Sequence, residues 1–146
     1  MTRILLINGP NLNLLGTREP ETYGYETLAD CEAMARRAAD DAGAAIDCRQ
    51  SNHEGEIVTW IQEARETTEA IVINAGAYTH TSVAIQDALR AYPGFIVELH
   101  VSNPHLREAF RHRSFISGPA HAVVAGFGVA AYPRVVKAVA ARLSPR

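Results

Sequence analysis

Ile4-Leu5-Leu6-Ile7-Asn8-Gly9-Pro10 is the stretch that decides the fold. Four consecutive apolar residues bounded by a turn signal are typical of a short strand buried on both faces. The strand stops abruptly, because Pro10 has no N–H group to donate and Gly9 permits unusual backbone dihedrals. We therefore predict a buried strand over residues 4–7 that ends in a loop.

The segment that follows, residues 8–24, is unusual for a simple connection. Loops longer than about 12 residues without secondary structure of their own are usually functional or disordered. Three leucines, at positions 12, 14 and 15, argue against disorder. We interpret this segment as an active-site loop, with Gly16 and Gly24 as hinges.

Short apolar runs alternate with amphipathic stretches along the rest of the chain. Further strands are predicted over residues 44–50, 70–73, 95–99 and 122–125, and helices over residues 27–43, 54–64, 81–91 and 132–143, with a helical turn near 106–110. The strand at 44–50 alternates apolar and charged residues, which suggests an edge strand. Residues 51–54 form a possible capping box at the start of the helix over residues 54–64. Five short strands separated by helices imply an α/β fold in which helices cover both faces of a parallel sheet.

Length and composition favour one domain over residues 1–146, with 47% hydrophobic and 21% charged residues. No apolar run approaches the roughly 20 residues of a membrane span, and the first strand leaves no room for a signal peptide, so we expect a cytoplasmic protein. A net charge of −2 without a basic run predicts no nucleic-acid partner. Cys31 and Cys48 show no metal or redox spacing and are interpreted as reduced thiols.

Polar and titratable residues gather where the predicted strands end. They are residues 8–11 after the first strand, 50–53 after the second, 74–80 after the third and 98–103 at the end of the fourth. In parallel α/β sheets, ligands bind beyond the carboxyl ends of the strands. These residues should therefore meet at one edge of the sheet and form a binding site.

Two pairs of residues could carry acid–base chemistry. Arg18 and Tyr23 share one loop, and a nearby guanidinium stabilises a phenolate, which would make Tyr23 a base. Glu98 and His100 would face the same side of a strand, and a carboxylate fixes the tautomer of an imidazole and suits it to be a general acid. The simpler alternatives are that Tyr23 packs on the surface and that His100 is structural.

Other polar residues near the strand ends could bind a ligand. Asn74 and His80 flank a turn before a helix, Ser102 precedes a helical turn, and Arg107 and Arg111 lie four residues apart, although turn formation and solvation are the simpler roles. No spacing of histidines and acidic residues matches a metal site, and no nucleotide-binding glycine motif follows the first strand. The only lysine, Lys137, lies in the last helix, which argues against a Schiff base.

Six motifs in order resemble type II 3-dehydroquinate dehydratase over nearly the whole chain. They are residues 7–16, Arg18-Glu19-Pro20 with Tyr23-Gly24, residues 50–55, residues 74–82, residues 98–103, and Arg107 with Phe110-Arg111-His112. The resemblance implies a flavodoxin-like three-layer sandwich with a five-stranded parallel sheet. It also implies an anti elimination of water from 3-dehydroquinate to 3-dehydroshikimate through an enolate, without a metal or cofactor.

The resemblance assigns a role to each candidate residue. Tyr23 matches the base with Arg18 beside it, His100 matches the acid oriented by Glu98, and Asn11 matches the residue that holds a water on the enolate oxygen. The positions that match substrate-binding residues are Asn74, His80, Val101, Ser102 and Arg111, and Arg107 corresponds to an arginine near the lid and base. The resemblance adds that Leu14 and Leu15 close the site.

The resemblance also implies an assembly and a metabolic setting. Family members form dodecamers built from trimers, and the counterpart of Asp87 reaches the site of a neighbouring subunit. The reaction belongs to the shikimate pathway of aromatic amino acid biosynthesis and to quinate metabolism. The alternative from another class is a flavodoxin-like or receiver-like module that binds a small molecule without turnover, although the chain lacks a phosphate loop and an acidic cluster.

Overall fold

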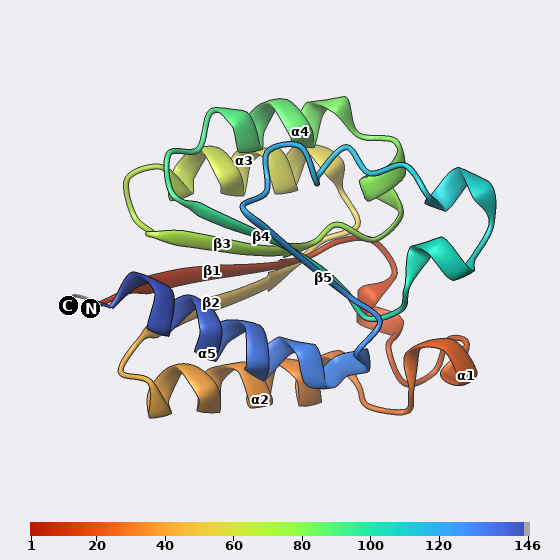
Figure 1. Ribbon diagram of the computed structural model, residues 1–146, viewed down its shortest axis with the longest axis horizontal. Coiled ribbons are helices and arrows are strands. Elements are labelled where there is room, and N and C mark those ends of the chain that lie inside the picture. The colour runs from red at the N-terminus through yellow and green to blue at the C-terminus, as the bar shows by residue number, and fades with distance from the viewer. Residues whose placement is uncertain (145–146) are drawn as a thin grey trace.

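The structure, a computed structural model, describes residues 1–144 and contains a five-stranded sheet between two layers of helices (Figure 1). The strands are β1 (Arg3–Asn8), β2 (Ala45–Gln50), β3 (Ala70–Asn74), β4 (Phe95–His100) and β5 (Ala122–Ala125). They lie in the order β2-β1-β3-β4-β5, and all neighbouring pairs are parallel. This is the strand order of flavodoxin-like folds, so the predicted fold class is confirmed. Residues 145–146 of the predicted domain lie outside the described residues.

Four long helices cover the sheet, two on each face. Helices α2 (Leu28–Asp41) and α5 (Ala131–Leu143) pack on one face, and α3 (Glu54–Ala64) and α4 (Val83–Arg90) on the other (Figure 1). A short helix, α1 (Pro20–Tyr23), and 3₁₀ turns at 12–14, 76–80, 104–106, 109–111 and 128–130 complete the described elements. Within residues 1–144, no helix is long and apolar enough to span a membrane.

The central strands supply two separate cores because their alternate side chains face opposite helix layers. Leu6 belongs to the core with α2 and α5, whereas Ile7 belongs to the core with α3 and α4, and both are fully buried. Strand β2 lies at the edge of the sheet, as predicted, and its residues are only half-buried or exposed. Apolar burial on both faces of β1 and β3 therefore anchors the strands whose ends carry the polar residues.

Most helix boundaries follow the predicted start signals, but three predictions need correction. The capping box predicted at 51–54 is wrong, because the Ser51 hydroxyl accepts a hydrogen bond from the His53 N–H (2.9 Å) and α3 begins without a side-chain cap. The helix predicted over 81–91 begins after Ser82, whose hydroxyl caps the N–H of Ile85. The single turn predicted near 106–110 is two separate 3₁₀ turns.

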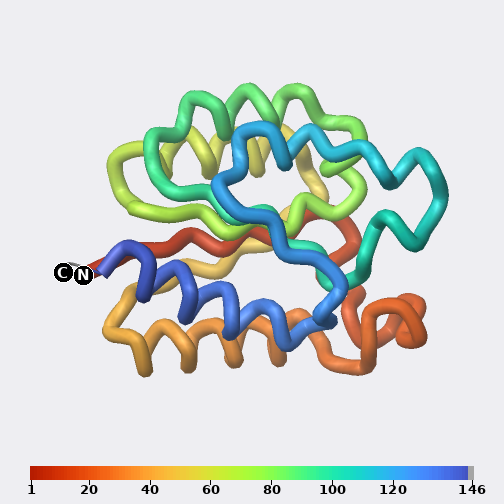
Figure 2. The backbone as a smooth tube through the Cα atoms, in the orientation of Figure 1, coloured from red at the N-terminus to blue at the C-terminus, as the bar shows by residue number. Residues whose placement is uncertain are grey.

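The carboxyl ends of the strands meet at one edge, where two long segments project beyond the sheet. One runs from the end of β1 through α1, and the other follows β4 and contains two 3₁₀ turns (Figure 2). Between β1 and β3 the chain is so close that a Cβ on Gly9 would lie 2.4 Å from the carbonyl oxygen of Ala75. Only glycine fits there, so the loop that leaves β1 is held directly against the start of the β3 loop.

Candidate active site

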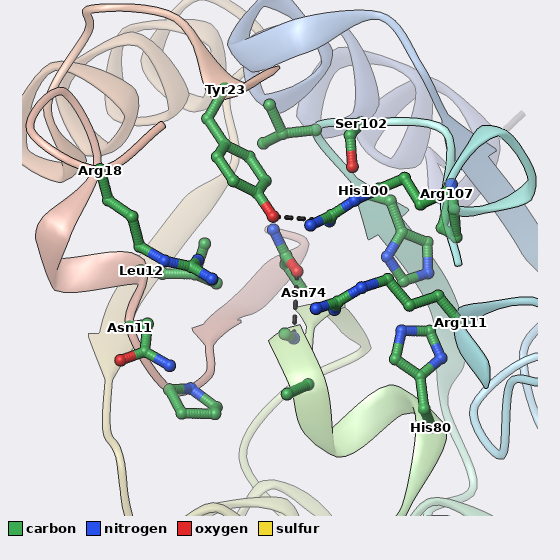
Figure 3. A pocket seen from close by; sticks show the side chains of 15 residues that line it. Asn11, Leu12, Arg18, Tyr23, Asn74, His80, His100, Ser102, Arg107 and Arg111 are labelled. Carbon is green, nitrogen blue, oxygen red and sulfur yellow. Dashed lines mark hydrogen bonds between the residues drawn. The ribbon is translucent and has the colours of Figure 1, made fainter. Parts of the chain in front are cut away.

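A pocket opens at this edge, between the two projecting segments (Figure 3). All the candidate residues except Asp87 and Glu98 line it. The lining residues are Pro10, Asn11, Leu12, Arg18, Tyr23, Asn74, Gly76, Ala77, His80, His100, Val101, Ser102, Pro104, Arg107 and Arg111. Leu12 takes the place predicted for Leu14 and Leu15, because Leu15 is buried in the core and Leu14 faces solvent.

Tyr23, the last residue of α1, lies between two arginines that come from different segments. The guanidinium carbons of Arg18 and Arg107 are each 5.4 Å from the centre of its ring. Arg107 Nη1 donates a hydrogen bond of 2.6 Å to the phenol oxygen (Figure 3). Loop spacing paired Arg18 with this phenol and the resemblance placed Arg107 near it; the residue that donates the hydrogen bond is Arg107. Both arginines therefore contact this one side chain, Arg107 at the phenol oxygen and both at the ring.

His100 lies at the end of β4, on the same face as Glu98, as predicted. Its Nε2 is 2.5 Å from Glu98 Oε2, and the Glu98 side chain is almost completely buried. Two further donors hold the carboxylate, the hydroxyl of Ser114 at Oε2 (2.7 Å) and the hydroxyl of Ser117 at Oε1. Burial alone would raise the pKa of Glu98, but the hydrogen bonds from His100, Ser117 and Ser114 outweigh it and lower that pKa below its ordinary value.

Asn74 lies at the end of β3, where a buried tyrosine from α5 positions it. Its amide nitrogen donates to the Tyr132 hydroxyl (3.0 Å), which in turn donates to Asn8 Oδ1 (2.6 Å). The Asn74 amide oxygen accepts from the N–H of Gly76 (3.2 Å). The two asparagines and the tyrosine therefore form a buried polar chain beneath the pocket floor, and the chain sets which way the Asn74 amide points.

Asn11 and His80 are fixed mainly by main-chain contacts. Asn11 has a left-handed backbone (φ 69°), which asparagine tolerates, and its N–H donates to Asn52 Oδ1 (3.0 Å). His80 Nδ1 lies 2.7 Å from the carbonyl oxygen of Arg113. Partial burial lowers the pKa of His80, and the neighbouring Arg111 acts in the same direction, so the ring is neutral at pH 7.

The charge of the pocket comes from three guanidinium groups. Arg18, Arg107 and Arg111 line it, and no aspartate or glutamate is among its lining residues within residues 1–144. Arg111 is held by Glu108, whose carboxylate lies 2.5 Å from its Nε. The pocket is therefore suited to a small anion such as a carboxylate. The neutral His80 imidazole and the amide groups of Asn11 and Asn74 are available to bind hydroxyl groups of such a ligand.

One predicted site residue, Asp87, lies outside the pocket. Asp87 is exposed on α4 and does not line the pocket, so its expected role in a neighbouring subunit stays a prediction. Across the described part of the chain, no group of three or more histidine, cysteine, aspartate or glutamate side chains could hold a metal ion. Both cysteines, expected as buried thiols, are free, but only Cys31 is buried and Cys48 is half-buried.

Three residues that hold the site were missed by sequence reasoning. Ser114 and Ser117 lie in an irregular segment without a periodic pattern, so nothing in the sequence aims them at Glu98. Tyr132 begins the helix predicted over residues 132–143 and joins the apolar core, but its hydroxyl also reaches Asn8 and Asn74. A hydroxyl in an otherwise apolar stripe was the one available signal, since buried tyrosines usually need a hydrogen-bond partner.

Residues 2–140 match the sequence profile of the family described as dehydroquinase class II. The chain belongs to this family. It is 52% identical to 3-dehydroquinate dehydratase 2 of Ralstonia nicotianae, over 100% of this chain and 98% of that protein. It is 57% identical to the 3-dehydroquinate dehydratase of Streptomyces avermitilis, over 94% of this chain and 87% of the relative.

A solved structure supports the same family. The type II dehydroquinase of Propionibacterium acnes superposes with a TM-score of 0.93 at 35% identity and covers 97% of each chain. The resemblance seen in the sequence motifs is therefore confirmed. Membership of the class II dehydroquinases makes the chain an enzyme of the hydro-lyase group.

Proposed function

We propose that this chain removes water from 3-dehydroquinate by anti elimination and gives 3-dehydroshikimate. One observation carries the proposal: a phenol beside two guanidinium groups and an imidazole beside a carboxylate line the same pocket from different elements. In this proposal the phenol is the base and the imidazole is the acid, because the reaction must take a proton from carbon and give one to the departing hydroxyl. The names of the relatives supply the substrate.

In the first step, the Tyr23 phenolate takes a proton from the carbon next to the substrate ketone. The electron pair of the broken C–H bond moves onto the ketone oxygen and gives an enolate. Arg107 donates to the phenol oxygen and Arg18 lies beside the ring, so both cations are positioned next to the proposed base. Asn11 holds the water that stabilises the enolate oxygen, and this charge develops in a pocket of fixed cations and amides.

In the second step, His100 protonates the departing hydroxyl group. The enolate collapses, the C–O bond breaks, and the hydroxyl leaves as water with the proton of the imidazolium. Hydroxide is a poor leaving group, so this proton transfer contributes strongly to the rate. Glu98 accepts a hydrogen bond from His100 Nε2, which leaves Nδ1 as the nitrogen that carries the transferred proton. The proton gained by Tyr23 and the one lost by His100 balance, and exchange with solvent restores both groups.

Substrate binding rests on the remaining pocket residues. Arg111 and the backbone N–H groups of Val101 and Ser102 take the carboxylate, because they supply positive charge and donors beyond the end of β4. Asn74 and neutral His80 take the hydroxyl groups of the ring.

The assembly is part of the proposal. We expect a dodecamer built from trimers in which Asp87 of one subunit completes the pocket of the next, in a single-domain cytoplasmic protein. Sedimentation of the purified protein tests the assembly, and a monomer at micromolar concentration would contradict it.

Ultraviolet absorbance tests the reaction, because the product is a conjugated enone carboxylate and the substrate is not. The purified protein is treated with a metal chelator and mixed with 3-dehydroquinate. A rise in absorbance that survives chelation is expected. No rise, from a folded and oligomeric protein, would contradict the proposed activity.

A further inference from the structure

The Glu98 carboxylate is held more completely than its contact with His100 requires. Each of its oxygens accepts at least one hydrogen bond, and two of the three donors are hydroxyls from one irregular segment, Ser114 and Ser117. Glu98 is only 2% exposed, so almost no solvent reaches the charge. A carboxylate this deeply buried depends on donors from the protein for its stability.

The direction of the Ser114 hydrogen bond follows from its other contacts. Its hydroxyl oxygen accepts from the N–H groups of Ile116 and Ser117, both at 3.1 Å. These two bonds use its acceptor capacity, which leaves the hydroxyl proton for Glu98 Oε2 at 2.7 Å. The turn at residues 114–117 therefore aims the Ser114 proton at the carboxylate and brings the Ser117 hydroxyl to the opposite oxygen.

The geometry has a consequence for His100. The two serine hydroxyls donate to Glu98 and stabilise its ionised form, so Glu98 accepts from His100 and the proton between them resides on Nε2 of the ring. Nδ1 then carries the second proton when the ring is charged, and it is unprotonated when the ring is neutral. If Glu98 rotated or became protonated, the ring could take the other tautomer and present the wrong nitrogen to the substrate.

We propose that Ser114 and Ser117 are positioning residues for the reaction, which hold the Glu98 carboxylate so that His100 delivers its proton from Nδ1. The inference rests on the proposed role of His100 as the acid. Both serines act through Glu98, and neither lines the pocket that holds Tyr23. Ser114, Ser117 and Glu98 line an adjoining cavity that shares His100 with the pocket but does not include Tyr23, so the two hydroxyls contact Glu98 outside the pocket that holds the base.

Ser117→Ala is the cleaner test, because the side-chain contact of Ser117 is with Glu98, whereas Ser114 also holds the turn. We expect kcat to fall about tenfold, the range of one hydrogen bond to a charged group, with KM changed by less than about twofold. The alkaline limb of the kcat profile should move to lower pH, because a displaced carboxylate stabilises the imidazolium less. Ser117→Thr keeps the hydroxyl and should restore both values, while Ser144→Ala, an exposed serine after α5, should change neither.

A double-mutant cycle and a spectrum separate positioning from a structural effect. In a Glu98→Gln background, Ser117→Ala should cause no further loss of kcat, because the residue through which it acts has changed. Nitrogen-15 spectra of histidine-labelled protein, with His100 assigned from its loss in His100→Asn, should show one neutral tautomer in the wild type and a mixture in Ser117→Ala.

The outcomes distinguish this inference from the proposed function. If the wild type does not dehydrate 3-dehydroquinate, or if His100→Asn keeps its rate, the proposed function fails. If the wild type is active and His100→Asn is not, but Ser117→Ala keeps the wild-type kcat, pH profile and His100 spectrum, the positioning role alone is overturned. Equal losses in the wild-type and Glu98→Gln backgrounds would overturn it as well.

Discussion

Arg107 donates a hydrogen bond of 2.6 Å to the phenol oxygen of Tyr23, across 84 residues of sequence. Tyr23 ends the short helix α1 after β1, and Arg107 follows the 3₁₀ turn after β4, so this single contact joins the two segments that project beyond the sheet. The contact holds Tyr23 over the pocket and places the positive charge of Arg107 beside the phenol oxygen. The same arginine therefore both positions the proposed base and contacts the oxygen that would take the proton.

Tyr23→Phe should abolish turnover and leave substrate binding nearly intact. The phenyl ring still packs between Arg18 and Arg107, but it has no oxygen to take the proton. General-base catalysis contributes about 10²- to 10⁴-fold, so kcat should fall within that range or below detection. Tyr25→Phe is the matched control, because Tyr25 is exposed and does not line the pocket. Absorbance gives the rates and calorimetry gives the binding; a wild-type rate in Tyr23→Phe would exclude this base.

Arg107→Lys should lower kcat more than it changes KM, although the charge is kept. A lysine ammonium lacks the planar guanidinium that reaches the phenol oxygen and lies against the ring at once. We expect kcat to fall about 10- to 100-fold, the effect of a lost charge-assisted contact at a reacting group. Arg113→Lys, whose guanidinium lies over Phe115 outside the pocket, is the control. A KM effect without a kcat effect would assign Arg107 to substrate binding instead.

Tyr132→Phe should destabilise the protein and impair the site together. It leaves Asn8 Oδ1 and the amide nitrogen of Asn74 without their buried partner, at a cost of about 1–3 kcal/mol for each unsatisfied group. The Asn74 amide also loses its orientation, so kcat/KM should fall at temperatures where the variant is folded. Urea unfolding and steady-state kinetics measure the two effects.

Tyr92→Phe is the matched control for Tyr132→Phe. The Tyr92 hydroxyl donates to the carbonyl oxygen of Thr68 (2.9 Å), before β3 and β4 begin, away from the pocket. It should lose stability without losing kcat/KM. An unchanged kcat/KM in Tyr132→Phe as well would show that Asn74 does not depend on the buried hydroxyl.

Acid should remove the stability that Glu98 contributes. The pKa of Glu98 is lower in the folded protein than its ordinary value of 4.5, so the fold favours the carboxylate. Its contribution is present above the ordinary value and is lost as the pH falls through the lower, folded pKa. The wild type should have a larger free energy of unfolding than Glu98→Gln. This difference should be larger at pH 7 than at pH 3. Glu66→Gln, an exposed carboxylate after α3, is the control, and a margin independent of pH would contradict the prediction.

Both cysteines should resist thiol reagents in the native protein. Burial is the main reason that the pKa of Cys31 is raised to about 12 and that of Cys48 to about 11. At pH 8 the thiolate fractions are then about 10⁻⁴ and 10⁻³, and only the thiolate reacts. Labelling should be at least about 100-fold slower in buffer than in urea. Variants with serine at one cysteine assign each rate, and rapid labelling of the folded protein would contradict the prediction.

The sheet and the pocket could be predicted from sequence because they depend on local patterns. Apolar runs marked four strands and alternation marked the edge strand, and the polar residues at the strand ends mapped onto one edge without knowledge of the strand order. Tyr23 and Arg107 could not be paired in this way, since their contact depends on how two irregular segments pack. The Ser51 hydroxyl formed a turn instead of a cap, because a short side chain can satisfy either nearby N–H group.

The base and the acid are anchored very differently. Tyr23 belongs to a helix of four residues, too short to be stable by itself, whereas His100 ends a buried strand. Inhibitors should accordingly divide into two kinetic groups. Compounds that stack on the Tyr23 ring need α1 in position and should dissociate slowly, because α1 must move before they leave. Compounds that contact only His100 and Arg111, on the opposite part of the pocket from Tyr23, should bind and dissociate quickly. The residence time of a compound therefore indicates whether it contacts Tyr23.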